Sequence, residues 1–364
     1  MSWGPGEQQP PTYPGNSSWP AYQGGQAWPP PQPVQPGRPA LPPYPHPEPR
    51  SYHEMLRTWN YAWWRPVLGL VAVAFGMIIV APLVLMPVLA AGVAVEGGPF
   101  LSRFEKAATL QTVDPAALLY LNLVLGSMIL VTWLAMRVLH RMRPRWLASV
   151  KPRLRWKFLF ACLGLAVVAL IAQVLVGAAL PGNDQGVGGH LNHLTGTTVS
   201  LAAIVLFTTP LQAAGEEYVF RGYLLQAFGA LFRIKWVAIT ISAALFAFAH
   251  GGQNFPLFFD RFFFGFIAAW LVTRTGGLEA GIAMHVLNNF LAFGLALSFG
   301  NITDTLSVSQ VGWSNIALTL TQSGVYAVLV LWLAKRMNLQ TRTRPPQRQQ
   351  PDPSYAPSVL PSGS

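Results

Sequence analysis

Eight apolar stretches constrain the fold of this chain more than any other feature of its sequence. They occupy about residues 66–91, 116–139, 158–180, 201–228, 236–250, 257–273, 278–299 and 316–334. A helix that spans a bilayer needs roughly 20 apolar residues, because its backbone N–H and C=O groups must find hydrogen-bond partners where water is absent. The pattern predicts an all-α fold, a polytopic bundle of about eight transmembrane helices within residues 61–337.

The composition agrees with a membrane protein. Of the 364 residues, 52% are hydrophobic and only 10% are charged, whereas a soluble domain carries about 25% charged residues. The net charge of +11 is concentrated in segments that flank the apolar stretches, where basic side chains meet lipid headgroups. We therefore expect the lipid bilayer as a partner and no binding of nucleic acid.

The two ends of the chain differ from its apolar middle. Residues 1–50 contain half of the chain's 32 prolines, interleaved with Gln, Gly, Trp and Tyr, and such a composition favours extended polyproline conformations over a packed core. The sequence predicts disordered tails at residues 1–60 and 338–364. A Pro-rich tail can also dock in the aromatic groove of a partner protein, and this alternative stays open.

Basic residues in the short loops predict how the bundle is oriented. The loop from Arg137 to Lys157 is densely basic and is therefore expected in the cytoplasm. Eight spans then place both termini in the cytoplasm, and the segments 181–198 and 300–314, which contain no Lys or Arg, fall outside. Arginine outnumbers lysine, a bias found in GC-rich genomes, and we expect a bacterial plasma membrane.

Three charged side chains lie together in the fourth apolar stretch. One charged residue at the centre of a membrane helix costs roughly 2.5–3.5 kcal/mol, so Glu216, Glu217 and Arg221 should face one another or a polar cavity. Helix positions four apart share a face, which pairs Glu217 with Arg221. Glu216 points elsewhere without a local cation and is the candidate general base. The alternative is a purely structural ion-pair network.

Two further spans each carry polar groups at the same four-residue spacing. Phe246 and His250 fall on one face of the fifth stretch, so the phenyl ring can support the imidazole. His285 and Asn289 share a face of the seventh stretch and can both donate hydrogen bonds to an oxyanion. Taken singly, His250 could be an interfacial histidine and the second pair an ordinary contact between helices.

Together these groups are typical of a hydrolytic site. A glutamate, two histidines and an asparagine can activate water and stabilise the tetrahedral intermediate of amide hydrolysis. Glu216, His250 and His285 could instead hold Zn²⁺. The sequence leaves both possibilities open, although it contains no His-Glu-x-x-His helix. We predict that these three residues and Asn289 converge on one cavity, which opens toward the cytoplasmic side.

The three motifs Glu-Glu-x-x-x-Arg, Phe-x-x-x-His and His-x-x-x-Asn, in this order on membrane helices, resemble the CPBP family of intramembrane proteases (CAAX protease and bacteriocin-processing, also called Abi). The resemblance covers about residues 200–295, the predicted protease core. The stretch from Phe262 to Leu278 is similar to the family's glycine-spaced segment and keeps Gly265. Glu279 departs from it, because an aromatic residue is common at that position.

The resemblance implies an intramembrane endopeptidase. Glu216 with His250 would activate the hydrolytic water, and His285 with Asn289 would stabilise the oxyanion. Glu217, Arg221 and Phe246 would support the site. The family is described both as metalloproteases and as glutamate-dependent enzymes that require no metal; we favour no required cofactor, with zinc as the alternative.

The substrate expected from the resemblance is a peptide or a membrane protein. Eukaryotic members of the family cut the C-terminal tripeptide from prenylated proteins, whereas bacterial relatives are linked to peptide maturation, bacteriocin immunity or surface-protein display. A non-catalytic immunity or scaffold protein, or a proton-coupled carrier that uses the two glutamates as a relay, is the competing class.

Overall fold

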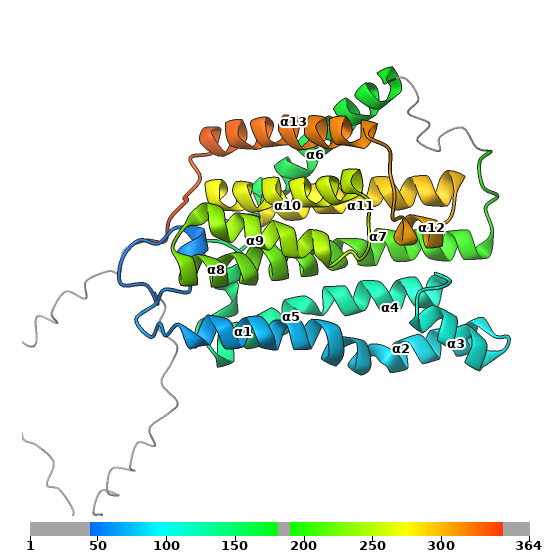
Figure 1. Cartoon of the computed structure of the whole chain (residues 1–364), viewed down its shortest axis with the longest axis horizontal. Helices are drawn as coiled ribbons and strands as arrows, with labels where there is room; N and C mark the ends of the chain where they lie inside the picture. Colours follow the sequence, from blue (N-terminus) through cyan, green and yellow to red (C-terminus); the bar gives the residue numbers. More distant parts are fainter. Residues whose placement is uncertain (1–43, 181–189, 345–364) are drawn as a thin grey trace, which may run out of the picture. The chain divides into compact units, whose positions relative to one another are not determined.

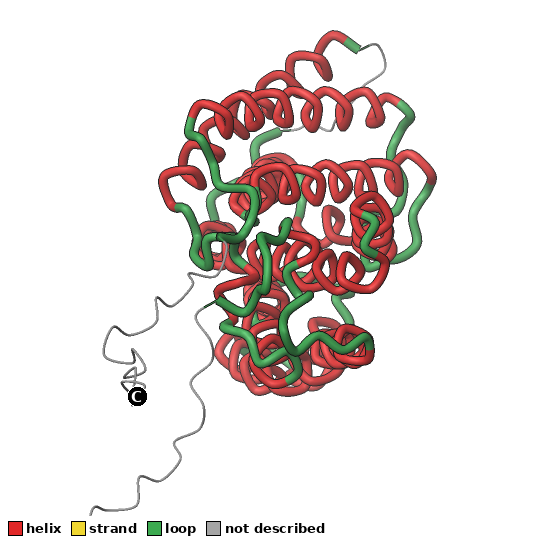
Figure 2. The backbone as a smooth tube through the Cα atoms, turned by 90° about the vertical axis from the view of Figure 1, so that its left-hand side faces the viewer, coloured by secondary structure: helices red, strands yellow, loops and turns green. Residues whose placement is uncertain are grey.

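The computed structural model describes residues 44–180 and 190–344, and every regular element in these ranges is a helix (Figure 2). The predicted all-α membrane fold is confirmed. Seven helical runs are long and apolar enough to cross a bilayer: Trp64–Glu96, Pro115–Val138, Trp156–Ala179, Gly196–Phe232, Phe255–Thr275, Glu279–Phe299 and Ser314–Arg336. The remaining predicted span is a shorter apolar helix, Lys235–Phe248.

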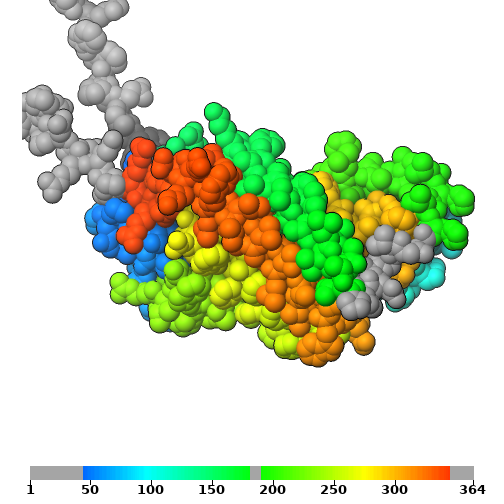
Figure 3. All heavy atoms as spheres, turned by 90° about the horizontal axis from the view of Figure 1, so that it is seen from above, coloured from blue at the N-terminus to red at the C-terminus, as the bar shows by residue number. Residues whose placement is uncertain are grey.

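The helices lie roughly side by side in layers (Figure 1). Helices α13 and α6 form one outer layer, α10 and α11 lie beneath them, and α7, α8 and α9 follow. Helices α4 and α5 pack against α7, and α1 and α2 lie on the far side of the bundle, where α1 also contacts α8. Figure 3 shows α13 and α6 along one face. The bounds are α1 Trp64–Phe75, α2 Ala81–Glu96, α3 Phe100–Ala108, α4 Pro115–Gly126, α5 Met128–Val138, α6 Trp156–Ala179, α7 Gly196–Glu217, α8 Leu225–Phe232, α9 Lys235–Phe248, α10 Phe255–Thr275, α11 Glu279–Phe299, α12 Ile302–Ser307 and α13 Ser314–Arg336.

Large apolar side chains are exposed along these helices. Leu83, Leu175, Phe207 and Val328 are each more than 60% exposed. Apolar surface on this scale is unusual for a soluble protein, and in a bilayer it faces lipid. The bundle is therefore an integral membrane protein whose polar groups gather in its interior.

Helix α9 is too short to cross a bilayer completely. Its 14 residues rise about 21 Å, against a hydrocarbon core of about 30 Å. The chain turns back after Phe248 and reaches Asn254, which caps α10. The Asn254 backbone N–H donates to Ser309 O at 2.8 Å and its side chain donates to Val311 O at 2.8 Å. The loop after α9 is thus fastened to the segment that precedes α13.

The helical domain extends further than the predicted tail boundaries at 60 and 338. Within residues 44–60, Tyr52, Met55 and Leu56 are buried, and Ser51 forms an isolated β-bridge with Arg342. Both terminal segments therefore pack against the basic end of the bundle, and the predicted boundaries were wrong because composition alone does not reveal such contacts. The rest of both predicted tails, residues 1–43 and 345–364, lies outside the described residues.

Candidate active site

The glutamate pair lies where helix α7 changes its geometry. Residues Tyr218–Leu224 form a π-helical segment that begins directly after Glu217. Such segments are rare and frequently occur at functional sites. The Ser242 hydroxyl of α9 donates to the carbonyl of Phe220 at 2.5 Å, so α9 supplies a partner for a backbone group of the π segment.

A second contact holds the π segment from the side of α5. The Tyr223 hydroxyl lies 2.8 Å from His140 Nε2, and both side chains are buried. Burial lowers the pKa of His140 to about 4, so its imidazole is neutral at physiological pH. A neutral histidine lets this contact form without placing another charge beside the glutamates.

Glu217 connects the Glu-Glu-x-x-x-Arg motif with the His-x-x-x-Asn motif. Arg221 Nη1 donates to Glu217 Oε1 at 2.7 Å, and both side chains are fully buried, so the predicted pairing is present. His285 Nδ1 lies 2.9 Å from the same oxygen. Because a carboxylate only accepts, Nδ1 carries the proton, and Nε2 faces Glu216 Oε2 at 3.8 Å.

Gln212 is a site residue that the sequence reasoning missed. Its side-chain amide donates to Glu216 Oε1, and its carbonyl oxygen accepts from Asn289 Nδ2 at 2.9 Å. Gln212 therefore connects the candidate base with the candidate oxyanion donor. The available signal was a polar amide four residues before Glu216, on the same helix face and inside an apolar stretch.

His250 lies at the edge of this cluster. Its Nδ1 donates to the carbonyl of Phe246 at 2.8 Å, which leaves Nε2 as an acceptor. The Phe246 ring packs edge-on against both imidazoles, with its centroid 4.7 Å from that of His250 and 5.9 Å from that of His285. His250 is exposed, whereas Glu216 and His285 are buried, and it interacts with both of them electrostatically.

Two glycines allow the neighbouring helices to approach the ion pair. A Cβ on Gly281 of α11 would lie 2.4 Å from Glu217 Oε2. A Cβ on Gly265 of α10 would lie 3.2 Å from Arg221 Nη2, and the Arg221 guanidinium sits 4.0 Å above the Phe246 ring. Close packing, rather than backbone freedom, thus explains these glycines.

The zinc alternative requires at least three protein ligands around one point. Among the residues that the structure describes, no group of three or more His, Cys, Asp or Glu side chains is placed to hold a metal ion. Two ligands of one tetrahedral zinc lie roughly 3.3 Å apart, which is near the separation of Glu216 and His285. His250 does not join these two in a group of three among the described residues, and its ring packs edge-on against Phe246.

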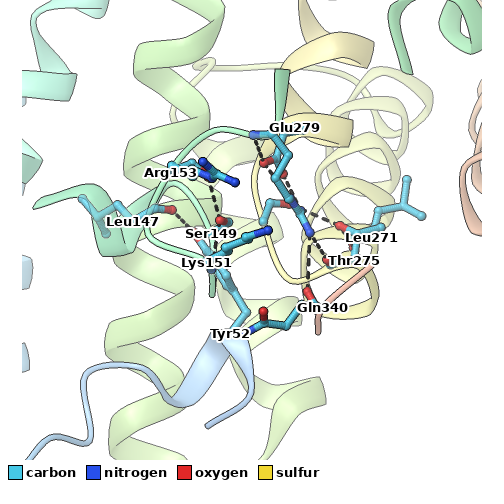
Figure 4. Close-up of polar contacts among 11 residues, drawn as sticks. Tyr52, Leu147, Ser149, Lys151, Arg153, Leu271, Thr275, Glu279 and Gln340 are labelled. Atoms are coloured by element: carbon cyan, nitrogen blue, oxygen red, sulfur yellow. Dashed lines mark hydrogen bonds and ion pairs between the residues drawn. The ribbon is translucent and has the colours of Figure 1, made fainter. Parts of the chain in front are cut away.

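A network of polar contacts lies at the end of the bundle that carries the basic loops (Figure 4). Glu279 begins α11 and is fully buried, and its carboxylate accepts from Arg155 Nη2 at 2.6 Å. Arg155 Nη1 also donates to Thr275 O at 2.8 Å, and the Leu278 N–H donates to Ala148 O at 2.9 Å. This network holds the loop before α6 against the end of α10 and the start of α11. The opening of the site toward the cytoplasmic side stays a prediction.

The exposed edge of the site is His250. The loop that follows it is fastened to the segment before α13, at the opposite end of that helix from Lys335 and Arg336. Glu279, in the network at the end of the bundle that carries the basic loops, lies six residues before His285 on α11.

Comparison with known proteins agrees with these motifs. A family model described as type II CAAX prenyl endopeptidase, Rce1-like, matches residues 198–291, which contain all three motifs. The predicted resemblance to CPBP intramembrane proteases is confirmed by this match, and the match implies a CAAX-type protease. The uncharacterized protein YyaK of Bacillus subtilis (strain 168) is 25% identical over 237 residues, covering 61% of this chain and 78% of the relative. No solved structure gives a significant match.

Proposed function

We propose that this protein is an intramembrane endopeptidase in which Glu216 activates water for attack on a peptide bond. The observation that carries the proposal is the pair of atoms Glu216 Oε2 and His285 Nε2, which face each other at 3.8 Å. This separation is too long for a direct hydrogen bond, and a water about 3 Å from both atoms would fit between them.

The proposed reaction uses the hydrogen bonds that Glu217 and Gln212 already make within the site. Glu216 takes a proton from the water, and the oxygen of that water bonds to the carbonyl carbon of the substrate. The developing oxyanion accepts a hydrogen bond from His285 Nε2 when that imidazole is protonated, and Glu217 stabilises the resulting positive charge. Collapse of the tetrahedral intermediate breaks the C–N bond, and Glu216 returns its proton to the leaving amine.

Asn289 and His250 complete the site. One N–H of the Asn289 amide is held by Gln212, so the other can donate to the oxyanion. The unprotonated Nε2 of His250 accepts a hydrogen bond from the water at the exposed edge. Gln212 acts as a positioning residue, because its two hydrogen bonds set the distance between base and oxyanion donor.

An apolar groove supports a substrate that lies within the membrane. Its volume is about 400 Å³, and it runs between α6 and α11, lined by Leu170 and Ile171 on one side and by Leu287, Phe290 and Leu291 on the other. Asn289 belongs to the same turn of α11. A hydrophobic segment of a peptide or membrane protein can therefore bind to α11, on a different face of the helix from His285 and Asn289.

The proposed setting is a bacterial plasma membrane with both termini in the cytoplasm, and the proposed chemistry requires no cofactor. Glu216 supplies the base, and His285 and Asn289 supply the oxyanion donors, which together cover the groups that amide hydrolysis needs. A chelator added to the purified protein is expected to leave cleavage unchanged. Loss of cleavage that zinc restores would favour the metalloprotease alternative.

The test is a proteomic comparison of membranes that contain the wild-type protein or Glu216→Gln. The glutamine keeps the shape of the side chain and removes the base. We expect membrane-protein fragments that occur with the wild type and not with Glu216→Gln, and these fragments identify the substrate. Glu105→Gln, the same change at an exposed position on α3, is the control and should give the wild-type pattern. Identical fragments from all three proteins would refute the proposal.

A further inference from the structure

A basic pocket lies at the same end of the bundle as the Arg155–Glu279 pair. Its volume is about 730 Å³, and it is formed by the start of α6 with the loop before it and by the chain that follows α13. The charged residues that line it are all cations: Lys151, Arg153, Arg155, Lys157 and Arg344. No lining residue is acidic, so the pocket has the electrostatic character of an anion site.

Only one of these five cations is neutralised by a neighbour. Arg155 is paired with Glu279, whereas the other four have no ion-pair partner among the described residues. Lys151, Arg153 and Lys157 are exposed, and Figure 4 shows Lys151 and Arg153 near the network around Glu279. About four unpaired positive charges therefore surround one cavity.

The pocket lies where two membrane helices begin or end. Trp156, which also lines it, is the first residue of α6 and is 59% exposed, and it stacks on Phe160 one turn further into the span. On α13, the Arg336 guanidinium lies 5.3 Å above the ring of Trp332, which is 53% exposed. Tryptophans at both helix ends mark the level of the lipid headgroups.

We propose that this pocket binds the phosphate diester of an anionic phospholipid headgroup. Basic pockets between membrane helices bind such headgroups, and the exposed apolar surfaces of α6 and α13 beside the pocket would accommodate the acyl chains. Inorganic phosphate shares the charged group and lacks the chains. The apolar surroundings therefore favour the lipid. This inference does not depend on the proposed peptidase activity.

The experiment compares two charge-matched variants of the full-length protein in dodecyl maltoside micelles. Lys151→Gln/Arg153→Gln/Lys157→Gln removes three pocket charges and keeps Arg155, whose loss would leave Glu279 unpaired. Arg145→Gln/Lys235→Gln/Arg274→Gln removes three charges from other parts of the chain near the basic helix ends. Binding of fluorescent phosphatidylglycerol is measured for both, with fluorescent phosphatidylcholine as the neutral probe.

The pocket variant should bind phosphatidylglycerol at least about tenfold more weakly than the wild type. The control variant should bind it within about twofold of the wild type, and phosphatidylcholine binding should be the same in all three. Equal losses in both variants, or no loss in either, would overturn the proposal.

A competition arm distinguishes the two sources of phosphate. Millimolar inorganic phosphate, added at constant ionic strength, should leave phosphatidylglycerol bound, and displacement would show that the pocket recognises free phosphate instead. If the triple variant does not fold, the single substitution Lys157→Glu takes its place. That variant should lower phosphatidylglycerol binding by at least about threefold, and unchanged binding would overturn the proposal.

Discussion

Two buried carboxylate–guanidinium pairs lie near opposite faces of the same stretch of α11, and they differ in how completely they are hydrogen-bonded. In the Arg155–Glu279 pair, both carboxylate oxygens accept from the guanidinium, at 2.9 and 2.6 Å, and Arg155 donates further to Thr275 O. In the Arg221–Glu217 pair a single bond joins the two groups, and Glu217 Oε2 and Arg221 Nη2 have no hydrogen-bond partner among the described residues.

In the proposed mechanism this difference separates a structural pair from a pair that takes part in chemistry. A saturated pair holds two segments together and has no capacity left for a reacting group. The unsaturated pair shares Glu217 Oε1 with His285 and lies beside Glu216, so its charges can respond when a proton moves. Burial of an ion pair alone therefore does not identify an active site.

Glu217→Ala should have the largest effect among the variants that test the difference between the two pairs. Removal of the carboxylate leaves Arg221 buried and unpaired, which should lower the free energy of unfolding by about 3–5 kcal/mol. It also leaves His285 Nδ1 without its acceptor, so the cleavage rate per folded molecule should fall at least about a hundredfold. Thermal unfolding in detergent and cleavage of the substrate found by proteomics measure the two effects. A stable, fully active variant would contradict the role given to Glu217.

The matched change at the other pair is Glu279→Ala. We expect a loss of about 3 kcal/mol in the free energy of unfolding, because Arg155 loses its partner. The cleavage rate of the folded fraction should stay within about threefold of the wild type, since Glu279 contacts no reacting group. The same two assays apply, and a large loss of rate without a loss of stability would place the saturated pair in the mechanism.

Gln212→Leu should have a smaller effect, and it tests whether Gln212 positions Glu216 and Asn289. The leucine has a similar volume but makes no hydrogen bond to Glu216 or Asn289. The cleavage rate should fall about tenfold to a hundredfold while the melting temperature changes little, because two reacting groups lose their common support. Gln322→Leu, a comparable buried amide on α13, is the control. Equal rates for both variants would remove Gln212 from the site.

Contacts within one helix could be predicted from the sequence. The length of the apolar stretches gave the helices, and the spacing of four residues gave the Glu217–Arg221 pair, because both depend on the regular geometry of a single helix. The spacing also placed Phe246 one turn before His250, where the structure has it.

Contacts between helices could not be predicted in the same way. The bonds from Asn289 to Gln212 and from His285 to Glu217 join α11 to a helix about 70 residues earlier in the chain, and local periodicity carries no information about such packing. The network around Arg155 is of the same kind, because it joins the loop before α6 to residues about 120 positions later. For this reason the spacing predicted the polar pairs of single helices and missed the bonds that join Gln212 to Asn289 and Glu217 to His285.

The central claim is that Glu216 is the general base, and its most direct test is the cleavage rate of purified Glu216→Gln. We predict a loss of at least about a thousandfold, with a melting temperature close to that of the wild type. Glu105→Gln should cleave at the wild-type rate. Cleavage by folded Glu216→Gln at a rate near that of the wild type would contradict the claim.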